Sequence, residues 1–243
     1  VPPFEGTNLE GVFTIHDMDE AAAIESYVSG QSPERATIVG GGYVGIEMAE
    51  ALAARGMDVA IYEMLPNVLQ PFGETVAGVV EKHLREQGVD LHLDTAVQGF
   101  DGEESVDRVV LEGGDSAPAD IAIVGVGVRP NAELAEAAGI ELGPTGAIAT
   151  DEYGRTNEEQ VYAAGDCAEA RHVVTGEPDH VPLALTANRS GRAIGQTVAG
   201  DPTPVGPIAG TAIVKAFDLG AARTGLVDEE RAAAAGFDPV SVT

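Results

Sequence analysis

Three glycines, Gly40, Gly42 and Gly45, stand at the G-x-G-x-x-G spacing directly after a short apolar segment. Glycines at this spacing can form a diphosphate-binding turn. Gly40 would permit the tight turn, Gly42 would let the backbone approach the diphosphate, and Gly45 would let a helix pack closely on the strand. Because the helix would begin near Val44, directly after Tyr43, its free N–H groups and partial positive charge would face the phosphates. These five residues predict a dinucleotide site.

A carboxylate, Glu63, ends the next apolar segment, 21 positions after Gly42. At this position it would accept hydrogen bonds from the adenosine ribose hydroxyls. A carboxylate there repels a 2′-phosphate, and residues 64–68 contain no arginine that would bind one. The pattern therefore favours NAD(H) over NADP(H). The alternative is a glycine-rich turn of an α/β fold that binds no ligand.

Apolar segments alternate with helical patterns up to residue 93, which is the arrangement needed to hold such a site. We expect strands at 35–39, 57–63 and 89–93, and helices at 17–28, 44–55 and 75–87. This alternation predicts an α/β fold with a Rossmann-like parallel sheet and right-handed crossovers. Strands expected at 96–100, 106–111 and 118–126 indicate an antiparallel meander and a return strand to the parallel sheet.

Beyond residue 126 the expected elements are shorter and more widely spaced. We expect a helix at 133–138, a strand at 161–163, a long helix at 183–199, paired strands at 211–217 and 221–226, and a final helix at 228–235. The proline-rich stretch 201–207 predicts a linker.

The charge of the chain is strongly acidic, with 40 Asp and Glu against 13 Lys and Arg and a formal net charge of −27. This balance argues against nucleic-acid binding, which needs cations to neutralise phosphates. The acids are interspersed among apolar periodic segments. That pattern favours a folded halophilic protein, with an acidic surface suited to concentrated salt, over a disordered acidic chain.

The remaining composition points to an ordinary intracellular chain. No apolar run reaches the roughly 20 residues that span a bilayer, so we expect no membrane segment. The single cysteine, Cys167, cannot form an internal disulfide, which indicates a cytoplasmic protein. The five histidines show no metal-ligand spacing, and we expect no metal.

Several ordered segments resemble one known family, the pyridine nucleotide-disulfide oxidoreductases. Residues 40–50 resemble its NADH motif, and 156–166 resemble its second flavin motif, T-x-x-x-x-(apolar)-Tyr-Ala-x-Gly-Asp. Residues 125–131 resemble the segment that joins the NADH domain back to the FAD domain. Residues 182–192 and 210–226 resemble the coenzyme A-disulfide reductase and NADH oxidase branch. The resemblance covers nearly the whole chain.

The resemblance implies a domain plan. It implies an NAD(H)-binding domain inserted in a partial FAD-binding domain, followed by the start of an α+β dimerisation domain. We expect a connector at 1–16, the NAD(H)-binding domain at 17–126, the carboxyl-terminal part of the FAD-binding domain at 127–200 and a truncated dimerisation domain at 208–243. A homodimer follows by analogy.

The resemblance also implies roles for individual residues. Tyr43 would cover the flavin until nicotinamide displaces it, and Glu47, one turn later, would approach the flavin as a second catalytic residue. Asp166 would bond a ribityl hydroxyl of FAD, with Gly165 allowing close approach. The remaining cofactor contacts would come from four backbone positions, Gly125, Gly127, Leu183 and Ala184.

The implied activity is transfer of hydride from NADH to FAD and then to a small-molecule acceptor. That acceptor would be a disulfide resembling coenzyme A disulfide, or dioxygen. One alternative is a ferredoxin reductase-type flavoprotein without a redox cysteine, and another is a non-catalytic nucleotide-binding module. The family's first flavin motif and its redox cysteine are not in this sequence. We therefore expect a piece of a longer polypeptide that is inactive by itself, with Cys167 as a packed residue.

Overall fold

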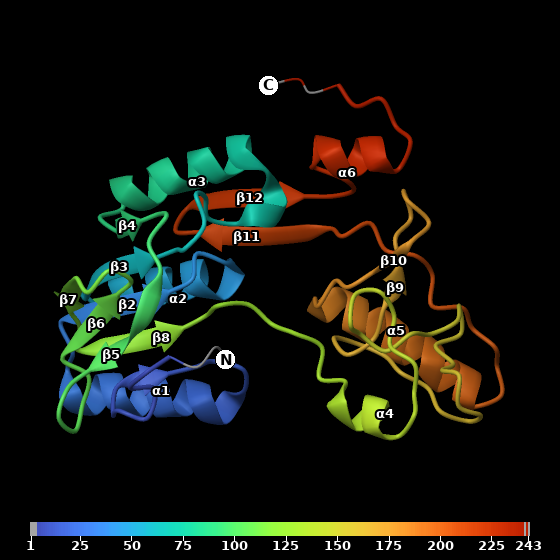
Figure 1. Cartoon of the computed structure of the whole chain (residues 1–243), viewed down its shortest axis with the longest axis horizontal. Helices are drawn as coiled ribbons and strands as arrows, with labels where there is room; N and C mark the ends of the chain where they lie inside the picture. Colours follow the sequence, from blue (N-terminus) through green and yellow to red (C-terminus); the bar gives the residue numbers. More distant parts are fainter. Residues whose placement is uncertain (1–3, 241, 243) are drawn as a thin grey trace. The chain divides into compact units, whose positions relative to one another are not determined.

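The computed structural model describes residues 4–240 and 242. Contacts divide the chain into two compact units (Figure 1). The first unit comprises Val1–Gly127 together with Ile213–Ala222, and the second comprises Val128–Ala212 together with Arg223–Thr243.

The first unit is built on a parallel sheet of five strands. In spatial order these are β1 (Val12–Phe13), β8 (Ile121–Val124), β2 (Arg35–Val39), β3 (Asp58–Tyr62) and β4 (Asp90–His92). Every pair of neighbours is parallel. The central strands β2 and β8 form nearly continuous apolar runs because both faces of the sheet are covered. The predicted α/β fold class is confirmed.

Helices cover one face of this sheet and the meander covers the other. The helices are α1 (Met18–Gln31), α2 (Tyr43–Ala53) and α3 (Glu74–Glu86), with a short 3-10 turn η1 (Gln70–Phe72) before α3. Ile38 faces Gly45 of α2, whereas the next residue, Val39, packs in a cluster with Val109 and Phe100 of the meander. Since successive residues of a strand point to opposite faces, α2 and the meander lie on opposite sides of β2.

The meander consists of three antiparallel strands, β5 (Val97–Asp101), β6 (Arg108–Leu111) and β7 (Ser116–Pro118). The single strand predicted at 118–126 is wrong, because it is divided between β7 and β8. Asp120 stands at the break, where its carboxylate accepts the backbone N–H groups of Arg35 at 2.9 Å and Glu34 at 3.2 Å. The chain changes layers here, which one charged residue between apolar neighbours does not reveal.

The predicted connector, 1–16, contributes to the first unit over residues 4–16, since 1–3 lie outside the described residues. Residues 12–13 form the edge strand β1, and Phe4, Leu9 and Val12 pack against the cluster between sheet and meander. A strand of two residues is too short to show a period-two pattern, so only its apolar character was visible in the sequence.

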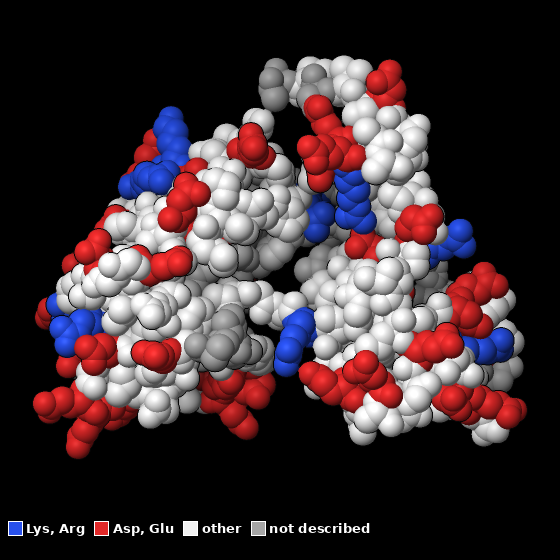
Figure 2. Space-filling view, viewed as in Figure 1, with Lys and Arg blue, Asp and Glu red and all other residues white. Residues whose placement is uncertain are grey.

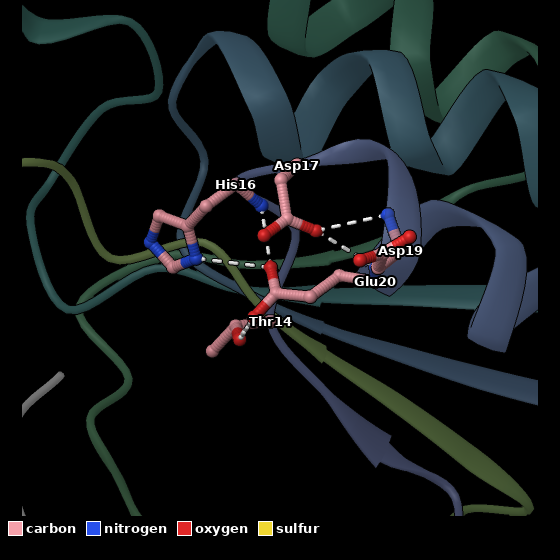
Figure 3. A network of polar contacts seen from close by, with 5 residues as sticks. All are labelled: Thr14, His16, Asp17, Asp19 and Glu20. Atoms are coloured by element: carbon pink, nitrogen blue, oxygen red, sulfur yellow. Dashed lines mark hydrogen bonds and ion pairs between the residues drawn. The ribbon is translucent and has the colours of Figure 1, made fainter.

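A network of polar contacts fixes the passage from β1 into α1 (Figure 3). Asp17 is the N-cap and accepts the N–H groups of Asp19 and Glu20 at 3.0 and 2.9 Å. The Glu20 carboxylate reaches back to the Thr14 hydroxyl at 2.8 Å and the His16 N–H at 2.6 Å. The Thr14 hydrogen bond is the main cause that holds the pKa of Glu20 below its usual value. This reciprocal capping defines where α1 begins.

The two-stranded sheet formed by β11 (Ala212–Ala216) and β12 (Leu219–Arg223) packs in the first unit. Glu50 of α2 binds Lys215 Nζ at 2.7 Å and accepts the N–H of Phe217 at 2.9 Å. The paired strands were predicted, but the turn was placed too late. It falls at Phe217 and Asp218, where Phe217 has a left-handed φ of 56°. The predicted segment 208–243 is therefore divided between the two units.

The second unit contains short elements joined by turns. These are α4 (Glu133–Ala137), α5 (Ala184–Val198), α6 (Glu229–Ala234) and the antiparallel pair β9 (Ala170–Arg171) and β10 (Pro178–Asp179). The strand predicted at 161–163 is wrong. Only Tyr162 forms a bridge, to Arg155, because the chain turns on both sides of this short segment.

Acidic side chains outnumber basic ones on the visible face of both units (Figure 2). Figure 2 shows Asp and Glu spread over the visible face of each unit, with fewer Lys and Arg among them. Among residues 4–240 and 242, no helix is long and apolar enough to cross a membrane. In the same part of the chain, no group of three or more His, Cys, Asp or Glu could hold a metal ion.

Candidate dinucleotide site

A cavity of about 340 Å³ opens in the first unit where the parallel strands end. Its lining comes from the segments that directly follow β2, β3 and β8. Crevices outside the carboxyl ends of parallel strands are where open α/β sheets bind ligands. The predicted site residues among the lining are Gly40, Gly42, Tyr43, Glu63, Gly125 and Gly127.

The three motif glycines meet different surroundings. Gly40 has a φ of +104°, and a Cβ there would lie 2.4 Å from the Gly125 carbonyl oxygen. A Cβ on Gly45 would lie 2.0 Å from the Gly40 carbonyl oxygen, so α2 can approach the turn only without a side chain. At Gly42 a Cβ would meet no protein atom within 4 Å. The fold itself requires Gly40 and Gly45, whereas the space at Gly42 is free for a ligand.

Glu63 points at the glycine turn, as the predicted ribose contact requires. Its side chain is only 9% exposed. Oε2 accepts the Gly41 N–H at 2.6 Å and Oε1 accepts the Leu65 N–H at 2.9 Å. Each carboxylate oxygen can accept a second hydrogen bond, so these contacts fix the group without saturating it. The arrangement can therefore receive ribose hydroxyls at the mouth of the turn.

Of the three residues predicted to act at the beginning of α2, one lines the cavity and two do not. Tyr43 lines the cavity, and its ring packs on Phe72 with 5.6 Å between centroids. Its hydroxyl is buried without a hydrogen-bond partner among the described residues. A buried orphan hydroxyl is costly, so Tyr43 fits a position that a polar ligand completes. Val44 and Glu47 are exposed and do not line the cavity.

The residues that form one wall of the cavity were not identified from the sequence. This wall is formed by the loop between β3 and η1, which contributes Leu65, Asn67 and Leu69. Leu69 has a left-handed φ of 47°, and its N–H donates to the Gly41 carbonyl at 3.0 Å. Residues 66–67 are of turn-forming types, but nothing in their order shows that the loop folds back over the glycine turn.

The residues predicted to hold FAD gather in the second unit. Gly165, with a φ of +82°, donates its N–H to Ser190 Oγ of α5 at 3.2 Å. Asp166 is exposed, and its backbone carbonyl lies 2.8 Å from His180 Nε2. Leu183 is the N-cap of α5, which begins at Ala184 without a side-chain cap. Gly165 therefore packs against α5, and a Cβ on it would lie 3.5 Å from the Ala187 Cβ in the first turn of that helix.

Cys167 lies in the same turn and is half-buried. Its Sγ donates to the Ala164 carbonyl at 3.4 Å. The flanking charges, Asp166 and Glu169, are acidic, whereas a reactive thiolate needs electropositive surroundings. The interpretation of Cys167 as a packed residue stays a prediction.

The fold and the site together define a class. A five-stranded parallel sheet, a glycine turn at the start of α2 and a carboxylate at the end of β3 make the first unit a Rossmann-type dinucleotide-binding domain. The family model for pyridine nucleotide-disulphide oxidoreductases matches residues 1–191. The chain belongs to this family.

Curated relatives fall in the predicted branch. An NAD(P)H coenzyme A polysulfide/persulfide reductase from Pyrococcus horikoshii is 42% identical over 231 residues, which are 95% of this chain and 52% of the relative. An NADH oxidase from Methanocaldococcus jannaschii is 36% identical over 227 residues, 93% of this chain and 50% of the relative. The chain thus spans about half the length of these relatives.

Solved structures agree with this placement. An NAD-dependent persulfide reductase from A. fulgidus superposes with a TM-score of 0.89 at 41% identity, covering 98% of this chain and 44% of that one. The water-forming NADH oxidase from Lactobacillus brevis, bound to NADH, superposes with a TM-score of 0.84 at 27% identity, covering 93% of this chain and 50% of that one. The family and branch expected from the motifs are confirmed.

Proposed function

We propose that this chain forms the NAD(H)-binding domain and part of the FAD-binding domain of an NADH-dependent flavoprotein oxidoreductase. Hydride passes from NADH to the flavin and then to a small-molecule disulfide of the coenzyme A type, or to dioxygen. The persulfide reductases and NADH oxidases among its relatives support this reading of the site. The observation that carries the proposal is the buried Glu63 carboxylate held against the glycine turn in the cavity.

In this proposal NAD(H) binds across the ends of β2 and β3. The N–H groups at the start of α2 hold the diphosphate, and Gly42 lets it come close. Glu63 accepts the ribose hydroxyls and, through its charge, disfavours a 2′-phosphate. Tyr43 yields its place to the nicotinamide ring and offers its hydroxyl to a polar group. Gly125 and Gly127 complete the opposite wall with backbone alone.

FAD is the second proposed cofactor, and it supplies the hydride acceptor when bound. The Asp166 carboxylate would hold a ribityl hydroxyl, since it is exposed beside Gly165, which carries no side chain. The uncapped start of α5, at Leu183 and Ala184, offers free N–H groups to a negatively charged edge of the flavin. Glu47 is proposed to contact the flavin from the exposed side of α2.

The acceptor and the setting are also proposals. Relatives named ferredoxin or rubredoxin reductase match at 33% and 31% identity, below the 42% of the persulfide reductase, so a disulfide or persulfide acceptor is favoured over a protein acceptor. We further propose a cytoplasmic homodimer for the complete protein. The single cysteine and the resemblance of residues 210–226 to a dimerisation domain support this setting.

Titration of this chain with NADH and NADPH, followed by nucleotide fluorescence, tests the proposal. Wild type should bind NADH at least about tenfold more tightly than NADPH, because a 2′-phosphate would face the Glu63 carboxylate. The E63Q variant keeps an acceptor oxygen but loses the charge, so the preference should shrink severalfold. Wild type that binds no NADH would contradict the nucleotide site. An unchanged preference in E63Q would contradict the role of Glu63.

A further inference from the structure

A second buried carboxylate, Glu81 of α3, lies near the cavity without lining it. Its side chain is 8% exposed, and Glu63 and Glu81 are the buried acidic residues of the described chain. Within residues 4–240 and 242, no ion pair joins Glu81 to a cation. Burying a charge is costly unless it is paired or hydrogen-bonded. The bonds that Glu81 makes should therefore serve a purpose that an apolar residue could not.

Those bonds go to the loop that forms one wall of the cavity. Glu81 Oε1 accepts Asn67 Nδ2 at 3.1 Å and the Val68 N–H at 3.2 Å. Asn67 lines the cavity, and Val68 is fully buried. Glu81 thus reaches the pocket only through the two residues it binds, from a helix that begins after the loop has ended.

The loop needs such support because its conformation is unfavourable by itself. Leu69 follows Val68 with a left-handed φ of 47°, which a side chain with a Cβ disfavours. Its N–H nevertheless reaches the Gly41 carbonyl at 3.0 Å. Val68 also packs on the glycine turn, since a Cβ on Gly41 would lie 2.7 Å from Val68 Cγ1. A contact that holds Val68 in place therefore also holds the loop 65–69 against the glycine turn.

The two buried carboxylates divide this work. Glu63 holds the start of the loop through the Leu65 N–H and contacts the pocket, while Glu81 holds its middle through Val68 from outside the pocket. We propose that Glu81 is a positioning residue that presets the wall at 65–69 for the adenosine half of the dinucleotide. The inference rests on the proposed function of the pocket, and it assigns Glu81 no contact with the ligand.

Three variants separate positioning from general stability. E81A removes both bonds and leaves the Val68 N–H buried without an acceptor. E81Q keeps an acceptor oxygen and removes the charge. L84A changes a fully buried residue one turn later on α3, which leaves a cavity in the core but keeps both bonds to the loop.

The measurements are the NADH dissociation constant, the unfolding temperature and amide hydrogen exchange without ligand. E81A should weaken NADH binding about tenfold or more, because losing bonds to a charged group would leave the preset loop conformation in only about a tenth of the molecules. It should also speed exchange at Val68 and Leu69. E81Q should stay within about threefold of wild type, because its oxygen still accepts. L84A should lower the unfolding temperature without changing the dissociation constant or the exchange at Val68.

Each result decides something. E81A with wild-type affinity and wild-type exchange overturns the proposal, and so does L84A if it weakens NADH binding as much as E81A. Binding by E81Q more than about threefold tighter than by wild type would show that the Glu81 charge opposes the ligand, which also overturns the proposal. If wild type binds no NADH, the proposed function fails. Exchange at Val68 and Leu69 then still decides whether Glu81 holds the loop.

Discussion

Replacing Gly42 by alanine is expected to weaken NADH binding while the chain stays folded. A Cβ at this position meets no protein atom within 4 Å. The backbone of Gly42, with φ −79° and ψ −170°, is extended and open to alanine. The residue lines the cavity, so the new methyl group would occupy space that the diphosphate needs.

The substitution changes the free energy of unfolding through two opposing effects and the NADH affinity through one. Alanine is a poorer N-cap than glycine, but it reduces the freedom of the unfolded chain by about 0.4–1 kcal/mol. The net change in unfolding free energy should stay near about 0.5 kcal/mol in either direction. Moving a phosphate oxygen off an N–H donor loses about 1.5–3 kcal/mol, a roughly ten- to hundredfold weaker affinity.

Two other glycines provide matched controls. G45A places a Cβ 2.0 Å from the Gly40 carbonyl oxygen, so it should lower stability by itself. Gly78 lies in α3 with nothing within 4 Å, and G78A should raise stability by about 0.5–1 kcal/mol without affecting NADH. The three variants make the same chemical change in three different surroundings.

Thermal unfolding with and without NADH provides the assay. At a concentration a hundredfold above the wild-type dissociation constant, binding adds about 2.7 kcal/mol to the stability of wild type and about 1.4 kcal/mol to a variant that binds tenfold more weakly. These differences correspond to several degrees for a chain of this size. An NADH-induced shift as large in G42A as in wild type would refute the reasoning, and so would loss of stability in ligand-free G42A comparable to that of G45A.

Two further predictions concern stability. The Arg35 hydrogen bond holds the pKa of Asp120 in the folded chain below its usual 3.8. The resulting stabilisation is complete above pH 3.8 and is lost as the pH falls through the lowered pKa of the folded state. D120N should therefore lower the urea midpoint at pH 7 by the equivalent of about 1–2 kcal/mol, with the gap to wild type closing below pH 3.8; a gap that persists in acid would contradict the role of the ion pair. The net charge of −27 should make the unfolding temperature rise with KCl from about 0.1 M to about 1 M, where screening shortens to roughly 3 Å. A flat or falling curve would argue against an acidic surface adapted to salt.

The site was predictable where its chemistry depends on residues close together in sequence. Gly40, Gly42 and Gly45 each act within one turn, and their spacing alone indicated a strand, a turn and a helix. Glu63 was found because one strand and one helix set its distance from the turn. The parallel sheet was predictable from the alternation of strands and helices, because the periodicity of apolar residues indicates whether a segment is a helix or a strand.

Other features depend on contacts that no local pattern records. Glu81 appears in the sequence as an ordinary helical acid, and only its burial against Val68 distinguishes it. Leu69 carries a backbone conformation that its residue type does not suggest. The break at Asp120 was hidden because apolar residues continue on both sides of it, and its hydrogen bonds run to residues more than 80 positions earlier.

The course of the chain between the units has a mechanical consequence. The polypeptide leaves the first unit after Gly127, returns at Ile213 to add a hairpin on α2, and leaves again after Ala222. The chain therefore crosses between the units three times, and after a nick at Gly127 the hairpin of the carboxyl-terminal fragment would meet α2 by noncovalent contacts alone. Those contacts include the bonds of the Glu50 carboxylate with Lys215 and Phe217. A gene that stops at residue 127 would lack that hairpin and leave the Glu50 carboxylate without these partners.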